Sequence, residues 1–322
     1  MLILLNLIIT LTNSWFSMWM IMEINMICFI SFIFFDKHIK KEIIMNYFLI
    51  QTFNSYLFLL SMIMMNYSNL DNFIYLMYLS MFTKLGIPPF YQWYLKMMNN
   101  LNWMNIFILS IMQKYIPLFI LSVLVKHNKM LLLHILLLLT SSLYSSIKGI
   151  NLINLKISMS HSSIIQMNWI ISNMMISEMN WIIYFEIYII IMLIVCMIFY
   201  NYEIYYLNQL YLLKFNSKMK YYMLNFCFFS LASLPPMYGF LMKLSALQIL
   251  YYYFSYLFIY LLILSSLISM FFYLRLLFNP IMFNFNSIKL NWLNFNYKNK
   301  NNYKIFILIW FNLIMMLIYE MV

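Results

Sequence analysis

Four ionisable side chains lie inside long apolar stretches of this sequence, where a charge is costly. Lys84, Lys114 and Lys243 each fall within a hydrophobic run, and Glu23 has apolar residues on both sides. A charged side chain at the centre of a bilayer costs roughly 2.5–3.5 kcal/mol on insertion scales, so such residues usually face the interior of a helix bundle and pair or relay protons. These residue types therefore indicate proton transfer.

Lysine suits proton transfer in such a place, because loss of water disfavours its charged form and brings its pKa toward neutrality. Lowering a lysine pKa from about 10.4 to about 7 takes roughly 4.6 kcal/mol, which is comparable with the insertion cost. A nearby carboxylate favours the charged form of lysine and therefore raises its pKa. A glutamate–lysine pair whose separation changes can therefore load and release a proton.

Some of these residues could instead be ordinary charges at the membrane interface, and this explanation fits them unequally. Lys114 lies near the middle of its run, too deep for its amine to reach the interface, and Lys84 lies one helical turn before a proline pair. Lys243 and Glu23 also fit interfacial charges when only their spacing is considered. Glu186, one turn into another run, is a weaker candidate.

Two proline pairs interrupt the apolar segments that carry Lys84 and Lys243. Residues 85–96 read L-G-I-P-P-F-Y-Q-W-Y-L-K and residues 232–243 read A-S-L-P-P-M-Y-G-F-L-M-K, so that a tyrosine, an aromatic residue and a lysine align. Adjacent prolines break or bend a helix. Interrupted segments at matching places in two halves indicate an inverted repeat with its working site near the breaks. The expected breaks lie at Pro88, Pro89, Pro235 and Pro236.

The composition is that of an integral membrane protein. Hydrophobic residues make up 66% of the 322 residues and charged residues 8%. At roughly 20 apolar residues per span, we expect an all-α transmembrane bundle of about eleven helices. The apolar segments run over about 1–18, 20–36, 44–65, 72–95, 103–125, 130–147, 157–176, 181–201, 221–249, 251–278 and 304–321, and no polar loop marks the division within 221–278.

The basic residues support this count, because alternate connections place nearly all of them on one side. That side carries Lys37, Lys40, Lys41, Lys96, Lys148, Lys156, Lys214, Lys218, Lys220, Lys289, Lys298, Lys300, Lys304 and Arg275, and the other carries Lys126 and Lys129. The positive-inside rule makes the basic side the matrix or cytoplasm and places the N-terminus there. The net charge of +11 needs no nucleic acid to explain it.

Other kinds of site are poorly supported. Three glycines leave no nucleotide-binding fingerprint. The solitary cysteines and scattered histidines give no metal, haem or cluster site, and His161 with its two following serines indicates a helix start (Cys28, Cys196, Cys227; His38, His127, His134, His161). The bias toward Met, with 32 of them, indicates a very AT-rich coding sequence, which points to an organellar or a reduced genome. Residues 1–12 lack a basic start, so we expect a span there and not a removed signal.

Several motifs cover nearly the whole chain, and they lie at Asn13–Met26, Asn46–Gln51, Lys84–Trp93, Trp103–Pro117, Ser162–Trp169, Leu234–Lys243 and Phe272–Leu276. In sequence and in order they resemble the motifs of one family, chain 2 of mitochondrial NADH-ubiquinone oxidoreductase, or respiratory complex I, of the insect type.

The resemblance implies a proton-translocating, antiporter-like subunit of the mitochondrial inner membrane with its basic loops in the matrix. It implies a single domain with inverted five-helix repeats over about 1–125 and 130–278 and a final helix over about 304–321. No cofactor is expected in this chain. NADH, FMN, iron–sulfur clusters and ubiquinone would belong to partner subunits, and the partners would be other membrane-arm and accessory subunits and lipid.

By motif, Glu23 matches the family's glutamate, Lys84 the broken-helix lysine, Lys114 the central lysine and Lys243 the exit-side lysine. Some positions depart from the pattern. Gln166 stands where the family often has histidine, and F-H-F-W becomes the four residues from Phe90 to Trp93. Two other lysines are expected outside the spans: Lys96 as a surface charge and Lys156 as a loop residue at a helix start.

The hypothesis is a relay. Glu23 and Lys84 form a pair whose strength a neighbouring subunit alters, Lys114 receives the proton through waters, and Lys243 delivers it. An ion–proton exchanger that works alone would share the fold, and a passive scaffold that joins neighbouring subunits is a further alternative.

Overall fold

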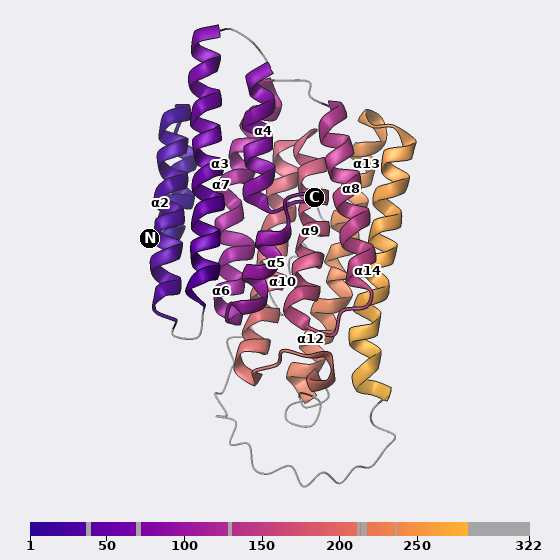
Figure 1. Ribbon diagram of the computed structural model, residues 1–322. Helices are drawn as coiled ribbons and strands as arrows, with labels where there is room; N and C mark the ends of the chain where they lie inside the picture. The colour runs from indigo at the N-terminus through magenta and orange to yellow at the C-terminus, as the bar shows by residue number, and fades with distance from the viewer. Residues whose placement is uncertain are drawn as a thin grey trace.

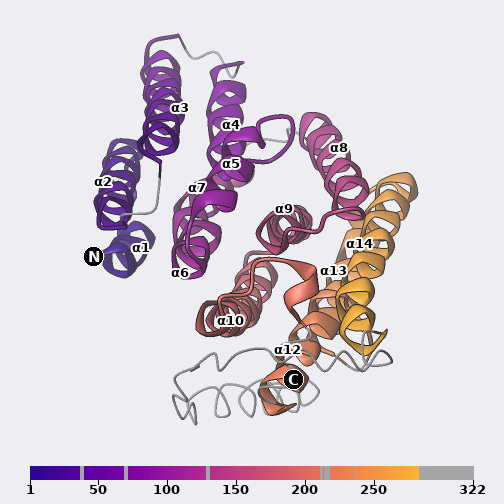
Figure 2. The ribbon, with the colours of Figure 1, turned by 60° about the horizontal axis from the view of Figure 1, so that its bottom comes forward.

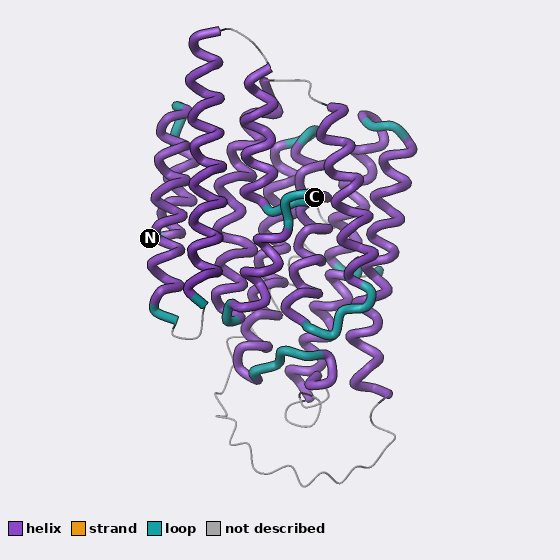
Figure 3. The backbone as a smooth tube through the Cα atoms, in the orientation of Figure 1, coloured by secondary structure: helices purple, strands orange, loops and turns teal. Residues whose placement is uncertain are grey.

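A computed structural model describes residues 1–36, 40–68, 72–127, 131–210, 213, 218–235 and 237–282. Its described part is a bundle of roughly parallel helices joined by short loops (Figures 1 and 3). The expected all-α class is confirmed. Some expected features lie outside the described residues. They are the final helix over 304–321, Pro236, His38 and the loop lysines Lys37, Lys129, Lys214, Lys289, Lys298, Lys300 and Lys304.

The first half of the chain forms the helices that carry Glu23, Lys84 and Lys114. They are α1 (Leu2–Ile8), the 3-10 turn η1 (Ile9–Leu11), α2 (Trp15–Phe34), α3 (Lys41–Ser68), α4 (Asn72–Leu85), α5 (Gln92–Asn100), α6 (Trp103–Phe107), the π-helical turn η2 (Ile108–Met112) and α7 (Gln113–His127).

The second half carries Lys243. Its elements are α8 (Leu131–Gly149), α9 (Leu155–Met174), α10 (Glu178–Tyr202), the 3-10 turn η3 (Leu207–Gln209), α12 (Lys218–Leu231), α13 (Tyr238–Tyr253) and α14 (Tyr256–Met282).

Each apolar segment expected between residues 1 and 278 coincides with a helix or with a pair of shorter ones, but one boundary is wrong. The first division lies at residues 12–14 and not near 18, because Ser14 caps α2 by accepting a hydrogen bond from Ser17 N at 3.3 Å. The unmarked division in 221–278 falls at Phe254 and Ser255.

Five described helices have both the length and the apolar composition to cross a membrane. They are Trp15–Phe34, Lys41–Met65, Trp103–Val125, Glu178–Tyr202 and Tyr256–Phe278. The remaining expected spans include shorter helices, among them the two interrupted ones.

The two interruptions lie at the proline pairs, as expected. The first separates α4 from α5 and includes Pro88 and Pro89, and the second separates α12 from α13 around Pro235. Each break frees carbonyl groups at the end of the preceding helix. Side chains from elsewhere satisfy them: Trp93 Nε1 donates to Thr83 O at 3.0 Å, and Gln166 Nε2 donates to Leu231 O at 3.3 Å.

Helix α9 is the axis of the bundle. It lies centrally in Figure 2 and contacts α5, α7, α8, α10, α13 and α14. All of its residues except Ile157 are buried, although many are serine, asparagine or glutamine. Its serine hydroxyls donate hydrogen bonds to backbone carbonyl groups of the preceding turn, as Ser158 does to Leu155 O at 2.9 Å. The bundle therefore has a polar line along its centre.

The halves use the same helix pairings. In the first half α2 contacts α3 and α7, and α4 contacts α3 and α7; in the second, α9 contacts α10 and α14, and α12 contacts α10 and α14. The division into two repeats remains a prediction that these matching pairs favour.

Two glycines at the breaks leave no room for a side chain. Gly86 has a φ of +69°, and an added Cβ would lie 2.8 Å from Tyr94 Cβ. A Cβ on Gly239, in the first turn of α13, would overlap the carbonyl of Ser230. At Gly149, by contrast, the added Cβ would meet the ring edge of Phe272 at 3.1 Å.

We therefore expect Gly86→Ala to destabilise the protein by at least about 1–2 kcal/mol, because the left-handed backbone costs that much for an L-residue even before the clash. Gly239→Ala should also destabilise, and Gly149→Ala should do so least. The thermal midpoint of the detergent-solubilised protein measures the effect. A Gly86→Ala midpoint equal to that of Gly149→Ala would contradict the assigned break geometry.

Candidate functional site

Lys84 is buried at the end of α4, next to the first break. Its side chain is 8% exposed, and Nζ lies 3.5 Å from Met22 Sδ on α2. Glu23, the next residue on α2, interacts with Lys84 electrostatically. Glu23 is half-buried, and its Oε1 has no hydrogen-bond partner among the described residues. The structure therefore brings the two charges near each other, with a thioether as the direct contact of the amine.

Lys114 lies deeper in the bundle, in the first turn of α7. It is 3% exposed; Nζ lies 4.1 Å from the ring centroid of Tyr94 and 3.5 Å from Ser163 Oγ. The π-helical turn η2 ends two residues before it, and Pro117 lies three residues after it. Because proline has no N–H, Pro117 leaves the carbonyl of Gln113 without its helical donor.

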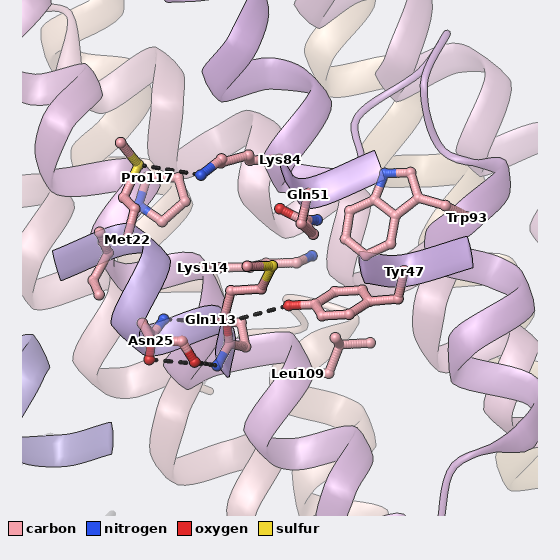
Figure 4. Close-up of a pocket in the computed structure, with 12 residues that line it drawn as sticks. Met22, Asn25, Tyr47, Gln51, Lys84, Trp93, Leu109, Gln113, Lys114 and Pro117 are labelled. Atoms are coloured by element: carbon pink, nitrogen blue, oxygen red, sulfur yellow. Dashed lines mark hydrogen bonds between the residues drawn. The ribbon is translucent and has the colours of Figure 1, made fainter. Parts of the chain in front are cut away.

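A cavity of about 20 Å³ joins the surroundings of these two lysines. Lys84 and Lys114 both line it, together with Gln51, Tyr47 and Trp93, and Figure 4 shows how these side chains lie. A cavity needs about 10–15 Å³ to hold one water, and it must offer polar partners. This cavity meets both conditions.

Gln113 is the polar hub of the cavity wall, and sequence reasoning missed it. Its Oε1 accepts hydrogen bonds from Asn25 Nδ2 at 3.1 Å and from Tyr47 OH at 3.3 Å, and its Nε2 lies 3.3 Å from Asn25 O. These bonds tie α2, α3 and α7 together beside Lys114. A polar residue next to a lysine in an apolar run was the available signal.

Ser163 connects Lys114 to the central helix α9. The hydroxyl donates to Ser160 O at 2.7 Å, so its oxygen accepts from Lys114 and from Tyr94 OH, which is 2.7 Å away. Tyr188 of α10 lies beside Ser163 and Tyr94. Three hydroxyl groups thus gather where α5, α9 and α10 meet.

Gln166 lies one turn farther along α9, at the second break. Its Oε1 accepts from Tyr184 OH at 2.6 Å while its Nε2 donates to Leu231 O. A cavity of about 20 Å³ lies against Gln166, Tyr184, Ser230 and Leu231. Gln166 therefore binds both a free carbonyl group of the break and a tyrosine hydroxyl.

Lys243 lies on α13 just beyond that break. It is 5% exposed, Nζ donates to Ser233 Oγ at 2.8 Å, and Nζ lies 5.7 Å from the ring centroid of Trp169 on α9. Ser233 belongs to the break and has a φ of 56°. A cavity of about 260 Å³ between α13 and α14 is lined by Lys243, Ser233 and mostly apolar side chains.

Two other lysines have different outcomes. Lys96 is exposed, as expected. The prediction of a loop position for Lys156 is wrong, since Lys156 belongs to the first turn of α9 and is 8% exposed. Its Nζ donates to Leu101 O at 2.6 Å and lies 4.7 Å from the Tyr205 ring centroid. It binds carbonyl groups just after α5, where a cation is favoured.

The remaining candidate residues lie outside the group formed by the lysines and their neighbours. Glu186 is exposed on α10. His134 and His161 are buried, and the ring of His134 packs edge-on against Tyr78 with centroids 4.4 Å apart. Among the residues that the structure describes, no three histidine, cysteine, aspartate or glutamate side chains gather as a metal site.

Comparison with known families agrees with this architecture. The profile described as NADH:quinone oxidoreductase/Mrp antiporter, TM, matches residues 12–269. The chain is 31% identical to NADH-ubiquinone oxidoreductase chain 2 of Anopheles gambiae over 310 residues, which is 93% of this chain and 89% of the relative. It is 30% identical to chain 2 of Locusta migratoria over 87% of this chain and 85% of the relative.

A shorter match reaches 36% identity with chain 2 of Rhipicephalus sanguineus, over 30% of this chain and 31% of the relative.

Solved structures share the fold at low identity. A chain of respiratory complex I from Thermus thermophilus with bound Aureothin has a TM-score of 0.76 at 15% identity, over 84% of this chain and 66% of that one. A chain of the archaeal membrane-bound sulfane sulfur reductase has a TM-score of 0.79 at 12% identity, over 96% and 69%. The Mrp complex from Dietzia contains one with a TM-score of 0.74 at 12% identity, over 83% and 57%.

The buried lysines beside two broken helices, the matched profile and the full-length relatives agree, and the chain belongs to the NADH-ubiquinone oxidoreductase chain 2 family within the NADH:quinone oxidoreductase/Mrp antiporter membrane proteins.

Proposed function

We propose that this chain is a proton-translocating membrane subunit of NADH:ubiquinone oxidoreductase, and that redox chemistry takes place in other subunits. The names of two relatives, both NADH-ubiquinone oxidoreductase chain 2, support membership of that enzyme. The observation that carries the proton role is the burial of Lys84, Lys114 and Lys243 inside the bundle, where Lys114 and Lys243 each lie beside a residue of α9. A membrane protein retains such groups where they are used.

The relay begins at Glu23 and Lys84, whose interaction changes when a neighbouring subunit moves. Water in the cavity of about 20 Å³ carries the proton from Lys84 to Lys114. Ser163 and the tyrosines around it lead from Lys114 along α9 to Gln166 at the second break. Lys243, which is bonded to Ser233 in that break, delivers the proton toward the exit.

The setting that fits this role is the mitochondrial inner membrane, with the N-terminus and the basic loops in the matrix. The start of α3 and the end of α8 lie at the same end of the bundle in Figure 1. Exposed lysines lie at these helix ends, Lys40 and Lys41 at the first and Lys148 at the second, and they support that orientation through the positive-inside rule. The partners would be other membrane-arm and accessory subunits and lipid. NADH, FMN, iron–sulfur clusters and ubiquinone would be bound by those partner subunits.

An exchanger that works alone is the second candidate, because the Mrp complex shares the fold at a TM-score of 0.74. Co-migration of the chain with NADH dehydrogenase activity on a native gel supports the first function, and migration without that activity supports the second. A passive scaffold does not account for three buried amines with polar neighbours, since each adds an insertion cost.

Replacing Lys114 by Met should lower coupled quinone reduction and proton pumping several-fold while the complex still assembles. The substitution keeps an unbranched side chain of similar length and removes the group that holds the proton. Lys148→Met is the matched control, since Lys148 is exposed at the end of α8. Full activity with full pumping in Lys114→Met would refute the role of this lysine.

The pairing of Glu23 with Lys84 predicts that their substitutions are not additive. Glu23→Gln and Lys84→Met should each lower coupled activity, and the double variant should lose little more than the worse single one, because residues that act as a unit couple strongly. Initial rates of the four proteins in sealed membranes complete the cycle. Losses that multiply independently would show that the two residues act separately.

A further inference from the structure

A second cavity, of about 230 Å³, lies between α3 and α5, and the relay does not use it. Three of its lining side chains are exposed and polar, and three are buried. The exposed set is Asn46, Gln92 and Lys96, and the buried set is Tyr47, Trp93 and Met97. The cavity therefore has a polar mouth and a largely aromatic floor.

Two of the three polar residues at the mouth, Asn46 and Lys96, lie toward the basic end of the bundle. Asn46 lies five residues after Lys41, the first residue of α3, which is about 7.5 Å along a helix. Lys96 lies in the second turn of α5, close to where that helix ends at Asn100. A cavity opening at this depth, with an amine and two amides around it, can admit water from the basic side.

The floor of this cavity is also a wall of the lysine cavity. Tyr47 and Trp93 line both cavities, and their ring centroids are 5.7 Å apart. Trp93 is held in place by its hydrogen bond to Thr83 O. Tyr47 presents a polar group to the other side, since its hydroxyl donates to Gln113 Oε1 beside Lys114.

We propose that the α3–α5 cavity is a hydrated vestibule and that Tyr47 is the residue through which protons pass from it to the lysine cavity. This inference rests on the proposed proton-translocating function and names the entry point for it. The phenol's own proton turns from Gln113 Oε1 to a water on the lysine side and passes to that water, while the phenol oxygen takes a proton from a hydronium ion on the vestibule side. The phenol ends unchanged, a neutral water remains in the vestibule, and one proton has crossed the floor.

Hydration can be tested separately from pumping by cysteine labelling of the intact complex in sealed vesicles. Ile50→Cys places a thiol in the cavity wall, and Leu49→Cys places one at the neighbouring position of α3, which is 58% exposed and outside the cavity lining. A thiol must ionise to react, and ionisation needs water. The readout is mass spectrometry of the peptide that carries the new cysteine, relative to the parent protein.

A charged, membrane-impermeant methanethiosulfonate added on the basic side should modify Cys at position 50 on the order of ten-fold faster than Cys at position 49, because only the former thiol can ionise in water. The same reagent on the opposite side should modify neither. Equal, slow rates with the charged reagent, together with rapid labelling of both positions by a membrane-soluble maleimide, would show that lipid fills the cavity and would overturn the vestibule.

The role of the hydroxyl is tested by Tyr47→Phe, which keeps the ring and removes the oxygen. The matched control is Tyr78→Phe, because the hydroxyl of Tyr78 is also buried and has no hydrogen-bond partner among the described residues. Tyr47→Phe should lower coupled quinone reduction several-fold and change its solvent deuterium isotope effect, whereas Tyr78→Phe should change neither. An unaltered rate and isotope effect in Tyr47→Phe would remove Tyr47 from the path.

These outcomes separate the inference from the function on which it rests. Labelling does not depend on pumping, so a hydrated vestibule is detectable even if Lys114→Met pumps normally. If Lys114→Met loses pumping while Tyr47→Phe keeps it, the relay stands and the entry point is elsewhere.

Discussion

An amine that is removed from water needs neighbours that accept its hydrogen bonds or stabilise its charge, and this requirement shapes the bundle. The three lysines of the proposed relay meet it through direct contacts with neutral groups, and the carboxylate of Glu23 acts on Lys84 electrostatically. Lys84 Nζ contacts the sulfur of Met22, Lys114 Nζ lies over the ring of Tyr94, and Lys243 Nζ donates to Ser233. A full carboxylate partner would hold an amine in its charged form, whereas neutral partners leave both protonation states within reach.

The irregular parts of the helices serve the same requirement. Lys84 is one residue from the end of α4, Lys114 follows the π-helical turn η2, and Lys243 bonds to a serine within the break between α12 and α13. In a regular helix the backbone carbonyl groups are already hydrogen-bonded within the helix, so few of them are free to accept a hydrogen bond from an amine at membrane depth. Each lysine therefore lies where the backbone has been opened, and side chains such as Trp93 and Gln166 satisfy the carbonyl groups that remain.

Sequence reasoning found the lysines and the breaks because both follow from local chemistry. A charge in an apolar run is conspicuous, and adjacent prolines cannot continue a helix. The polar residues around the lysines could not be found in this way. Gln113 lines the lysine cavity and Ser163 reaches Lys114 only because of how each helix is rotated about its own axis and which distant segments pack together. The loop position predicted for Lys156 is wrong for a related reason. A basic residue on that side of the membrane fits a loop, but the Nζ of Lys156 donates to the carbonyl of Leu101, which is far from it in the chain.

The most direct measurement is a density map of the intact complex that resolves ordered water around the buried amines. The account predicts at least one water in the cavity between Lys84 and Lys114, within hydrogen-bonding distance of an amine and of a polar side chain of the wall. A dry contact there, with the two lysines separated by closely packed apolar side chains, would contradict it.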